Sequence, residues 1–165
     1  MISGLFLLLL LTWSAPAKAQ GWACWGQAAE RYHVNVNLLY AIARVESGMN
    51  YQAIGARNPD GSYDIGLMQI NSGWLPTLAK YGITESRLLS DPCLNLNVGA
   101  WILSQGLTRL GYNWKGLGAY NAASNDKRAI YAGKVVAMLQ RISREQAAQA
   151  SVRGPVSGLQ VAEAR

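Results

Sequence analysis

The sequence predicts a mainly α-helical domain that contains one small β-hairpin, which is an α+β fold class. Apolar residues recur at helical spacing over most of the chain between Cys24 and Arg144. Residues 50–71 lose that spacing and contain Asn58-Pro59-Asp60-Gly61, a strong turn sequence. The chain has 165 residues, so we expect one domain with short accessory segments at its ends.

The first 19 residues have the pattern of a cleavable signal peptide. Leu5–Leu11 form an apolar core, and Ala17-Lys18-Ala19 supplies the small-x-small pattern of a cleavage site. The apolar stretch is shorter than the roughly 20 residues that a membrane-spanning helix needs. Met1–Gly4 contain no Lys or Arg, which keeps a retained N-terminal anchor as the second interpretation. We expect export, cleavage after Ala19 and no stable membrane span in the mature chain.

Export gives the two cysteines, Cys24 and Cys93, a structural interpretation. An even number of cysteines in an exported chain indicates a disulfide, which here would close a loop of about 69 residues. The alternative is two free buried thiols, which an oxidising compartment disfavours. A single histidine and two distant cysteines do not support a zinc site, so we expect no metal and no cofactor.

The first half of the domain contains two expected helices and the hairpin. Cys24–His33 has apolar residues at helical spacing. A second helix follows Asn35 or Asn37, either of which can cap it, and ends at Gly48. Ser62–Ile65, next to the strong turn, is the expected short strand of the hairpin.

Helical patterns return after Asn71. The expected helices begin near Trp74, cover Leu94–Leu110 after Pro92, include part of Trp114–Asn125, and end with Ala129–Arg144. Beyond Arg144 large apolar residues become rare while Ala, Gln, Gly and Ser increase. We therefore expect a domain over residues 20–144 and a disordered tail over residues 145–165.

The net charge is +6 and the isoelectric point is about 9.6, which raises the possibility of a nucleic-acid partner. The Lys and Arg residues are scattered singly, and no aromatic-basic motif of the common RNA-binding modules is present. A basic exported protein is equally suited to an anionic polymer such as the cell wall. We expect no nucleic-acid binding.

Glu46 is the most informative polar residue of the chain. On a helical projection of 100° per residue it falls between Leu39 and Ile42, on the apolar side of its helix. A carboxylate there is costly unless it is paired or protonated, which favours a functional role. The alternative is a helix-end glutamate that turns to water before Gly48. Helix position alone does not separate the two.

Three segments together carry a family resemblance: Val45-Glu46-Ser47-Gly48, Gly66-Leu67-Met68-Gln69-Ile70-Asn71 and Ala119-Tyr120-Asn121-Ala122. In this order and spacing they resemble the soluble lytic transglycosylase family, and most of all its small specialised branch. That branch accompanies type III secretion, conjugation and type IV pilus systems. The resemblance covers the chain from about Cys24 to Ile142, including both cysteines.

The resemblance implies a lysozyme-like fold with a saccharide cleft between a helical lobe and the β element. It implies a periplasmic enzyme that cleaves the β-1,4 bond between N-acetylmuramic acid and N-acetylglucosamine in peptidoglycan glycan strands. The family's usual product is a 1,6-anhydromuramic end, because the C6 hydroxyl of the sugar attacks in place of water. Its partners would be components of a secretion, conjugation or pilus assembly.

Glu46 matches the catalytic acid of the family, and Asp64 is the candidate second carboxylate. Asp64 lies 18 residues after Glu46, in a stretch that also resembles c-type lysozymes. It would stabilise an oxocarbenium-like transition state or form a covalent adduct. The alternative is an aspartate that bonds the backbone of the Asn58–Gly61 turn.

The resemblance also implies five substrate-binding residues: Ser47, Met68, Gln69, Tyr120 and Asn121. Each has a structural alternative. Ser47 can cap its helix, Met68 can pack in the core, and Gln69 can satisfy backbone groups. Tyr120 would orient the acid or lie in the core, and Asn121 would bind sugar or cap a helix. Trp74 and Trp114 can stack on sugar rings, but they can equally be core residues.

Two other functions stay open at this stage. A hydrolysing muramidase would use Glu46 and Asp64 as a lysozyme-like pair. A non-catalytic peptidoglycan-binding subunit would keep the cleft without turnover.

Overall fold

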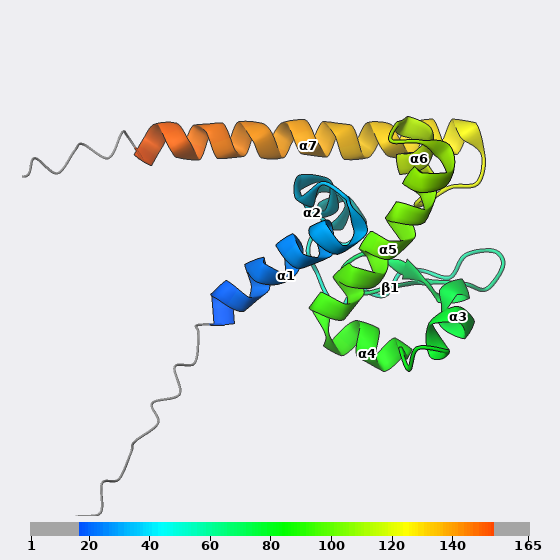
Figure 1. Ribbon diagram of the computed structural model, residues 1–165. Helices are drawn as coiled ribbons and strands as arrows, with labels where there is room; N and C mark the ends of the chain where they lie inside the picture. Colours follow the sequence, from blue (N-terminus) through cyan, green and yellow to red (C-terminus); the bar gives the residue numbers. More distant parts are fainter. Residues whose placement is uncertain (1–16, 154–165) are drawn as a thin grey trace, which may run out of the picture.

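The computed structural model describes residues 17–153 and shows a mostly helical domain with one two-stranded antiparallel hairpin (Figure 1). This confirms the predicted fold class. The elements are α1 (Ala17–Tyr32), α2 (Val36–Glu46), β1 (Asp64–Ile65), β2 (Ile70–Asn71), the 3-10 helix η1 (Ser72–Trp74), α3 (Leu75–Ala79), α4 (Glu85–Ser90), α5 (Pro92–Leu110), α6 (Trp114–Gly118) and α7 (Asn125–Arg153).

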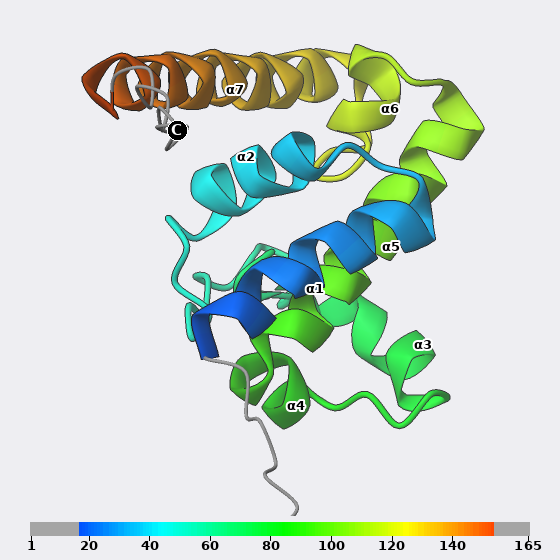
Figure 2. The same ribbon diagram turned by 60° about the vertical axis from the view of Figure 1, so that its left-hand side comes forward.

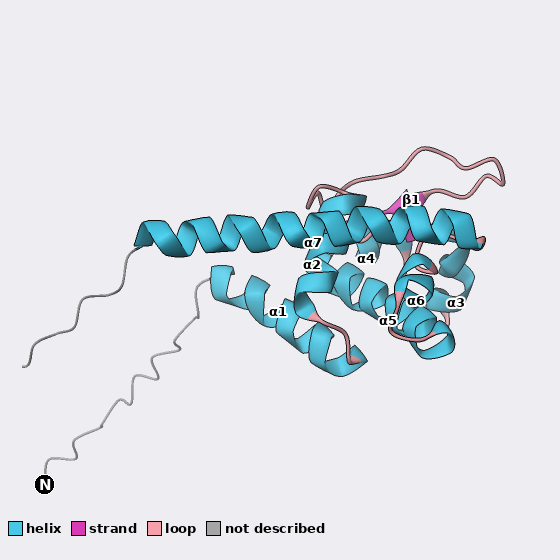
Figure 3. Cartoon of the chain, turned by 90° about the horizontal axis from the view of Figure 1, so that it is seen from above, coloured by secondary structure: helices cyan, strands magenta, loops and turns pink. Residues whose placement is uncertain are grey.

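Helix α5 is the central element of the core. It buries an almost continuous apolar surface and packs against α1, α4 and α6. Helix α7 covers α2 and α6 from the other side, and α2 lies alongside the middle of α7 (Figure 2). Seen from above, α7 crosses the whole domain (Figure 3). The end of α2 is thereby held between the body of the domain and α7.

The hairpin is attached to α5 through Asn95, the one buried polar residue of the described core. Its side chain accepts a hydrogen bond from the Met68 backbone N–H at 2.8 Å. It donates to the carbonyls of Ile65 at 2.9 Å and Leu88 at 3.2 Å. Because a buried amide needs partners for both of its ends, Asn95 fixes the hairpin turn to one place on the helix.

The predicted strand around Ile65 is confirmed as β1. The strand that pairs with it is β2, which follows Gly66 in the sequence. Asp64 pairs with Asn71, and Ile65 pairs with Ile70. On the other side only a single bridge joins Ile65 to Ile54. The Asn58–Gly61 turn is present at the tip of that wider loop, where the Gly61 N–H donates to the Asn58 carbonyl.

A disulfide joins Cys24 to Cys93, with their Cα atoms 5.9 Å apart. It confirms the predicted bridge and excludes the pair of free thiols. The bond connects α1 to the first turn of α5 and closes a chain segment of 69 residues. It therefore links the N-terminal helix to the central helix of the core.

The ends of the chain differ from the expected boundaries. Helix α7 continues to Arg153, so the prediction that order ends at Arg144 is wrong for the residues up to 153. Composition misled the prediction, because the Ala-rich stretch has high helix propensity although it buries little. Arg141 also forms an ion pair with Glu145 one turn later, at 2.8 Å.

Helix α1 begins at Ala17, earlier than the expected start at Cys24. The apolar part of the predicted signal peptide and the final part of the predicted tail, residues 154–165, lie outside the described residues. Across residues 17–153, the helices are all too short or too polar to cross a bilayer.

Candidate active site

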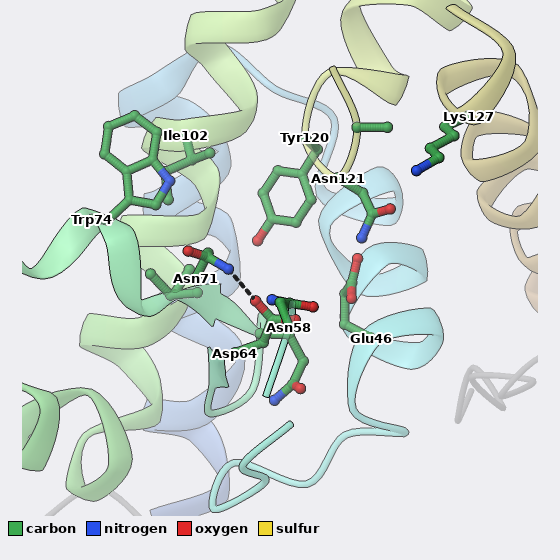
Figure 4. A pocket seen from close by; sticks show the side chains of 12 residues that line it. Glu46, Asn58, Asp64, Asn71, Trp74, Ile102, Tyr120, Asn121 and Lys127 are labelled. Atoms are coloured by element: carbon green, nitrogen blue, oxygen red, sulfur yellow. Dashed lines mark hydrogen bonds between the residues drawn. The ribbon is translucent and has the colours of Figure 1, made fainter. Parts of the chain in front are cut away.

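A cleft of about 350 Å³ opens where α2, the hairpin, α5 and the segment between α6 and α7 meet (Figure 4). Its lining is mostly polar. The lining residues are Glu46, Asn58, Asp64, Gln69, Ile70, Asn71, Trp74, Ile102, Tyr120, Asn121, Ala122 and Lys127. Residues from all three motifs of the sequence therefore meet in one cavity.

Glu46 is the last residue of α2 and turns into this cleft. Burial raises its pKa from 4.5 to about 7, and the negative charge of Asp64 also acts to raise it. The hydrogen bond from Tyr131 and the positive charge of Lys134 act in the opposite direction and lower the pKa. A carboxyl group with this pKa holds a proton for a substantial fraction of the time at neutral pH. The structure thus excludes a helix-end glutamate turned freely to water.

Tyr131 holds the Glu46 side chain in place, and the sequence did not reveal it. Its hydroxyl donates a hydrogen bond to Oε1 of Glu46 at 2.5 Å, across 85 residues of sequence. Burial raises the pKa of Tyr131, and the charge of Glu46 raises it further, so the phenol keeps its proton and remains a donor. In the sequence it is one more apolar position of a helix, with no local motif to mark it.

Tyr120, which was expected to orient the acid, has another partner. Its hydroxyl donates to the Met68 carbonyl at 2.7 Å. Its ring stacks on that of Tyr131 with the centroids 6.3 Å apart. Tyr120 lines the cleft, and the hydrogen bond to Glu46 comes from Tyr131 instead.

Tyr131→Phe is expected to move the alkaline limb of the activity profile to higher pH by about 1 unit. The hydroxyl stabilises the charged form of Glu46, so its removal raises the pKa of that carboxyl group. The measurement is the rate of peptidoglycan cleavage against pH. Tyr112→Phe is the control, because Tyr112 bonds the His33 carbonyl far from the cleft. An unchanged limb in Tyr131→Phe would show that the bond has no influence on the acid.

Asp64 lines the same cleft from the hairpin side (Figure 4). Its Oδ1 accepts a hydrogen bond from the side-chain amide of Asn71 at 3.0 Å. The turn-stabilising role considered for Asp64 belongs to Asp60, whose Oδ1 accepts from the backbone and the hydroxyl of Ser62. The Asp64 carboxylate therefore stands close enough to Glu46 to raise its pKa.

Two predicted substrate-binding residues do not line the cleft. The Met68 side chain is fully buried against Gly99 of α5, so the prediction that it contacts substrate is wrong. Ser47 ends α2, and its hydroxyl donates to the Leu67 carbonyl at 2.7 Å. Ser47 therefore joins the end of α2 to the hairpin turn, which is a structural role.

Of the remaining candidates, Gln69, Asn121 and Trp74 line the cleft and Trp114 does not. Gln69, at a φ of 48°, donates to the Gly66 carbonyl at 2.8 Å, so it satisfies backbone groups while it borders the cavity. Asn121 is exposed at the cleft edge. Trp74 also lines the cleft, where its ring packs edge-on against Trp101. Trp114 is exposed and does not belong to this cavity.

Comparison with known proteins gives a consistent family assignment. Residues 23–134 match the family model described as "Transglycosylase SLT domain". Invasion protein IagB of Salmonella typhimurium is 44% identical over 124 residues, which are 75% of this chain and 77% of IagB. Protein IpgF of Shigella flexneri is 39% identical over 126 residues, which are 74% of this chain and 82% of IpgF.

A solved structure has the same fold. The lytic transglycosylase Slt of Pseudomonas aeruginosa, determined as an inactive mutant, superimposes with a TM-score of 0.58 at 22% sequence identity. The match covers 76% of this chain but only 24% of the longer Slt chain. It shows the fold of the domain and not the activity of the whole Slt protein.

Proposed function

Since this chain belongs to the transglycosylase SLT family, we propose that it is a peptidoglycan lytic transglycosylase. Its substrate would be the β-1,4 bond between N-acetylmuramic acid and N-acetylglucosamine. The observation that supports this most is Glu46, a half-buried carboxyl group with a pKa of about 7 on the wall of a polar cleft.

In the first step Glu46 acts as general acid. A sugar oxygen leaves slowly as an alkoxide, so it must receive a proton while the glycosidic bond breaks. Burial keeps that proton on Glu46 near neutral pH, in the same way that an apolar pocket keeps the catalytic glutamate of lysozyme protonated. The Tyr131 hydroxyl holds one carboxyl oxygen, Oε1. We propose that Oε2 carries the proton to the leaving oxygen.

In the second step the Glu46 carboxylate acts as general base. It accepts the proton of the muramic C6 hydroxyl, whose oxygen then bonds to C1 of the same sugar. The product is a 1,6-anhydromuramic end, and no water is consumed. The proton that Glu46 gave to the leaving group is thereby replaced, so the enzyme returns to its starting state.

Purified sacculi test whether the chain cleaves peptidoglycan. We expect the turbidity of a sacculus suspension to fall and soluble muropeptides to appear. A chain that sediments with sacculi and releases no fragments would instead be a binding subunit, which is the function that requires no turnover.

Asp64→Asn is expected to lower the cleavage rate by about 100-fold. We propose that the Asp64 carboxylate stabilises the positive charge that develops on the sugar ring. Since that carboxylate also raises the pKa of Glu46, its neutralisation should move the alkaline limb to lower pH. Asp60→Asn removes an exposed turn carboxylate outside the cleft and serves as the matched control. A full rate in Asp64→Asn would exclude Asp64 from catalysis.

The position of Asp64 also supports the second candidate function, a hydrolysing muramidase. Two carboxylates on one cleft match the arrangement that glycosidases use with water as acceptor. The chemical form of the product separates this activity from transglycosylation, because hydrolysis leaves a reducing end.

The setting of the activity follows from the same family. We propose that the catalytic domain begins at residue 20 after removal of a signal peptide, and that it acts in the periplasm. There it would open the wall locally for a secretion, conjugation or pilus apparatus. The similarity to a protein named for invasion supports an envelope-associated role of this kind.

A further inference from the structure

Two lysines of α7, Lys127 and Lys134, lie close to the candidate acid: Lys127 lines its cleft, and the charge of Lys134 acts on Glu46. Both side chains are exposed, and Lys127 lines the cavity itself. Within the described residues neither lysine forms an ion pair or a hydrogen bond with another side chain or carbonyl group. An exposed cation that is neither ion-paired nor hydrogen-bonded is available for a ligand.

The two lysines belong to the same side of α7 as Tyr131. Lys127 precedes Tyr131 by four residues and Lys134 follows it by three, the spacing at which helical side chains are neighbours. Tyr131 contacts Glu46 directly, and the charge of Lys134 reaches Glu46 strongly enough to lower its pKa. Lys127 and Lys134 therefore flank Tyr131, the residue that is hydrogen-bonded to Glu46.

Other basic residues in this region already have partners. The Arg128 guanidinium donates to the Ala122 carbonyl at 3.0 Å and to the side chain of Asn125. Arg44 and Arg141 both pair with Glu145. Lys127 and Lys134 are thus distinct from neighbours whose side chains are already hydrogen-bonded or ion-paired.

The acidic and basic side chains of the cleft come from different elements. The carboxyl groups of Glu46 and Asp64 come from α2 and β1, whereas Lys127 extends from α7 on the side of Glu46 and Asn121, away from Trp74 (Figure 4). A neutral glycan backbone offers no group that requires a cation. A substituent that carries carboxylates offers groups that a cation can bind.

Muramic acid has such a substituent. Its C3 lactyl arm projects from the sugar ring and ends either in a carboxylate or in a peptide stem with carboxylates of its own. An arm that leaves a sugar bound in the cleft would pass over the rim, where exposed lysines can meet it. N-acetylglucosamine has no counterpart.

We propose that Lys127 and Lys134 bind carboxylate groups of the peptide stem on muramic acid, so that the cleft prefers stem-bearing strands to glycan stripped of its peptides. This inference rests on the proposed function and names the form of the substrate that the site selects.

Equilibrium binding with the full chain carrying Glu46→Gln tests the proposal without turnover. The two ligands are soluble glycan strands with intact peptide stems and the same strands after an amidase has removed the stems. We expect the stem-bearing strands to bind about fivefold more tightly. Lys127→Gln with Lys134→Gln should abolish that preference.

Lys80→Gln with Lys115→Gln is the charge-matched control, because both lysines are exposed and lie outside the cleft. It should keep the full preference. Equal binding of the two ligands by the chain with all its lysines intact would overturn the proposal. An equal loss of preference in the control would overturn it too, because it would indicate general charge attraction. Cleavage of sacculi by the wild-type chain is scored separately, so a failure of the proposed activity is distinguishable from a failure of stem recognition.

Discussion

Glu46→Gln is expected to lower the rate of sacculus cleavage by about 10³-fold. Glutamine keeps the shape of the side chain and can still accept the hydrogen bond from Tyr131, but it has no proton to give and cannot act as a base. Both steps of the proposed reaction therefore lose their proton carrier. The measurement is the initial rate of muropeptide release at pH 6–7, close to the pKa of about 7.

The fold should survive this substitution. Folding raises the pKa of Glu46, so stability associated with this group is fully present at low pH and is lost as pH rises towards about 7. A neutral glutamine removes that loss, and we expect Glu46→Gln to be at least as stable as the wild type above pH 7. Glu30→Gln, an exposed change on α1, is the matched control with an unchanged rate. Cleavage at the wild-type rate by Glu46→Gln would exclude the assignment of this residue as the acid.

Removal of the disulfide is expected to have the largest effect on stability. Chain-entropy estimates for a closed segment of 69 residues predict that Cys24→Ala with Cys93→Ala lowers the free energy of unfolding by about 4 kcal/mol. For a domain of this size the melting temperature should fall by about 10–15 °C. Urea denaturation, followed by far-ultraviolet circular dichroism, measures the difference.

A reducing agent provides the control for this prediction. It should destabilise the wild-type protein to the level of the double variant and leave the variant itself unchanged. Equal midpoints for the oxidised wild type and the variant would contradict a stabilising role for the bond. Neither cysteine lines the cleft, so the folded variant should retain cleavage at low temperature.

The sequence predicts much of the helical framework because its apolar spacing is regular. It also identifies Glu46, since a carboxyl group between Leu39 and Ile42 conflicts with the rest of that helix face. Because that carboxyl group is buried, its pKa is raised. The disulfide was predictable from the expected export and the even number of cysteines.

Residues that act through distant contacts could not be found in this way. Tyr131 meets Glu46 across 85 residues, and nothing in its own helix distinguishes it from a core residue. Asn95 is similar, because an asparagine in an apolar helix becomes informative only when its three backbone partners are known. Such contacts depend on tertiary packing.

For the motif residues Met68 and Ser47, in contrast, the sequence suggested a direct role that the structure does not show. Their place in a recognisable segment suggested sugar contact, but the segment positions the cleft through its backbone. The Met68 carbonyl accepts a hydrogen bond from the Tyr120 hydroxyl, and the Leu67 carbonyl accepts one from the Ser47 hydroxyl. The side chains that border the cavity are those of neighbouring residues such as Gln69.

The end groups of the products test the central claim most directly. Purified sacculi are digested with the wild-type chain, and the soluble muropeptides are compared by mass spectrometry with those that a hydrolysing muramidase releases. We predict muramic ends that are lighter by one water, which is the 1,6-anhydro form. Products that carry only reducing ends would contradict transglycosylation and assign Glu46 and Asp64 to hydrolysis.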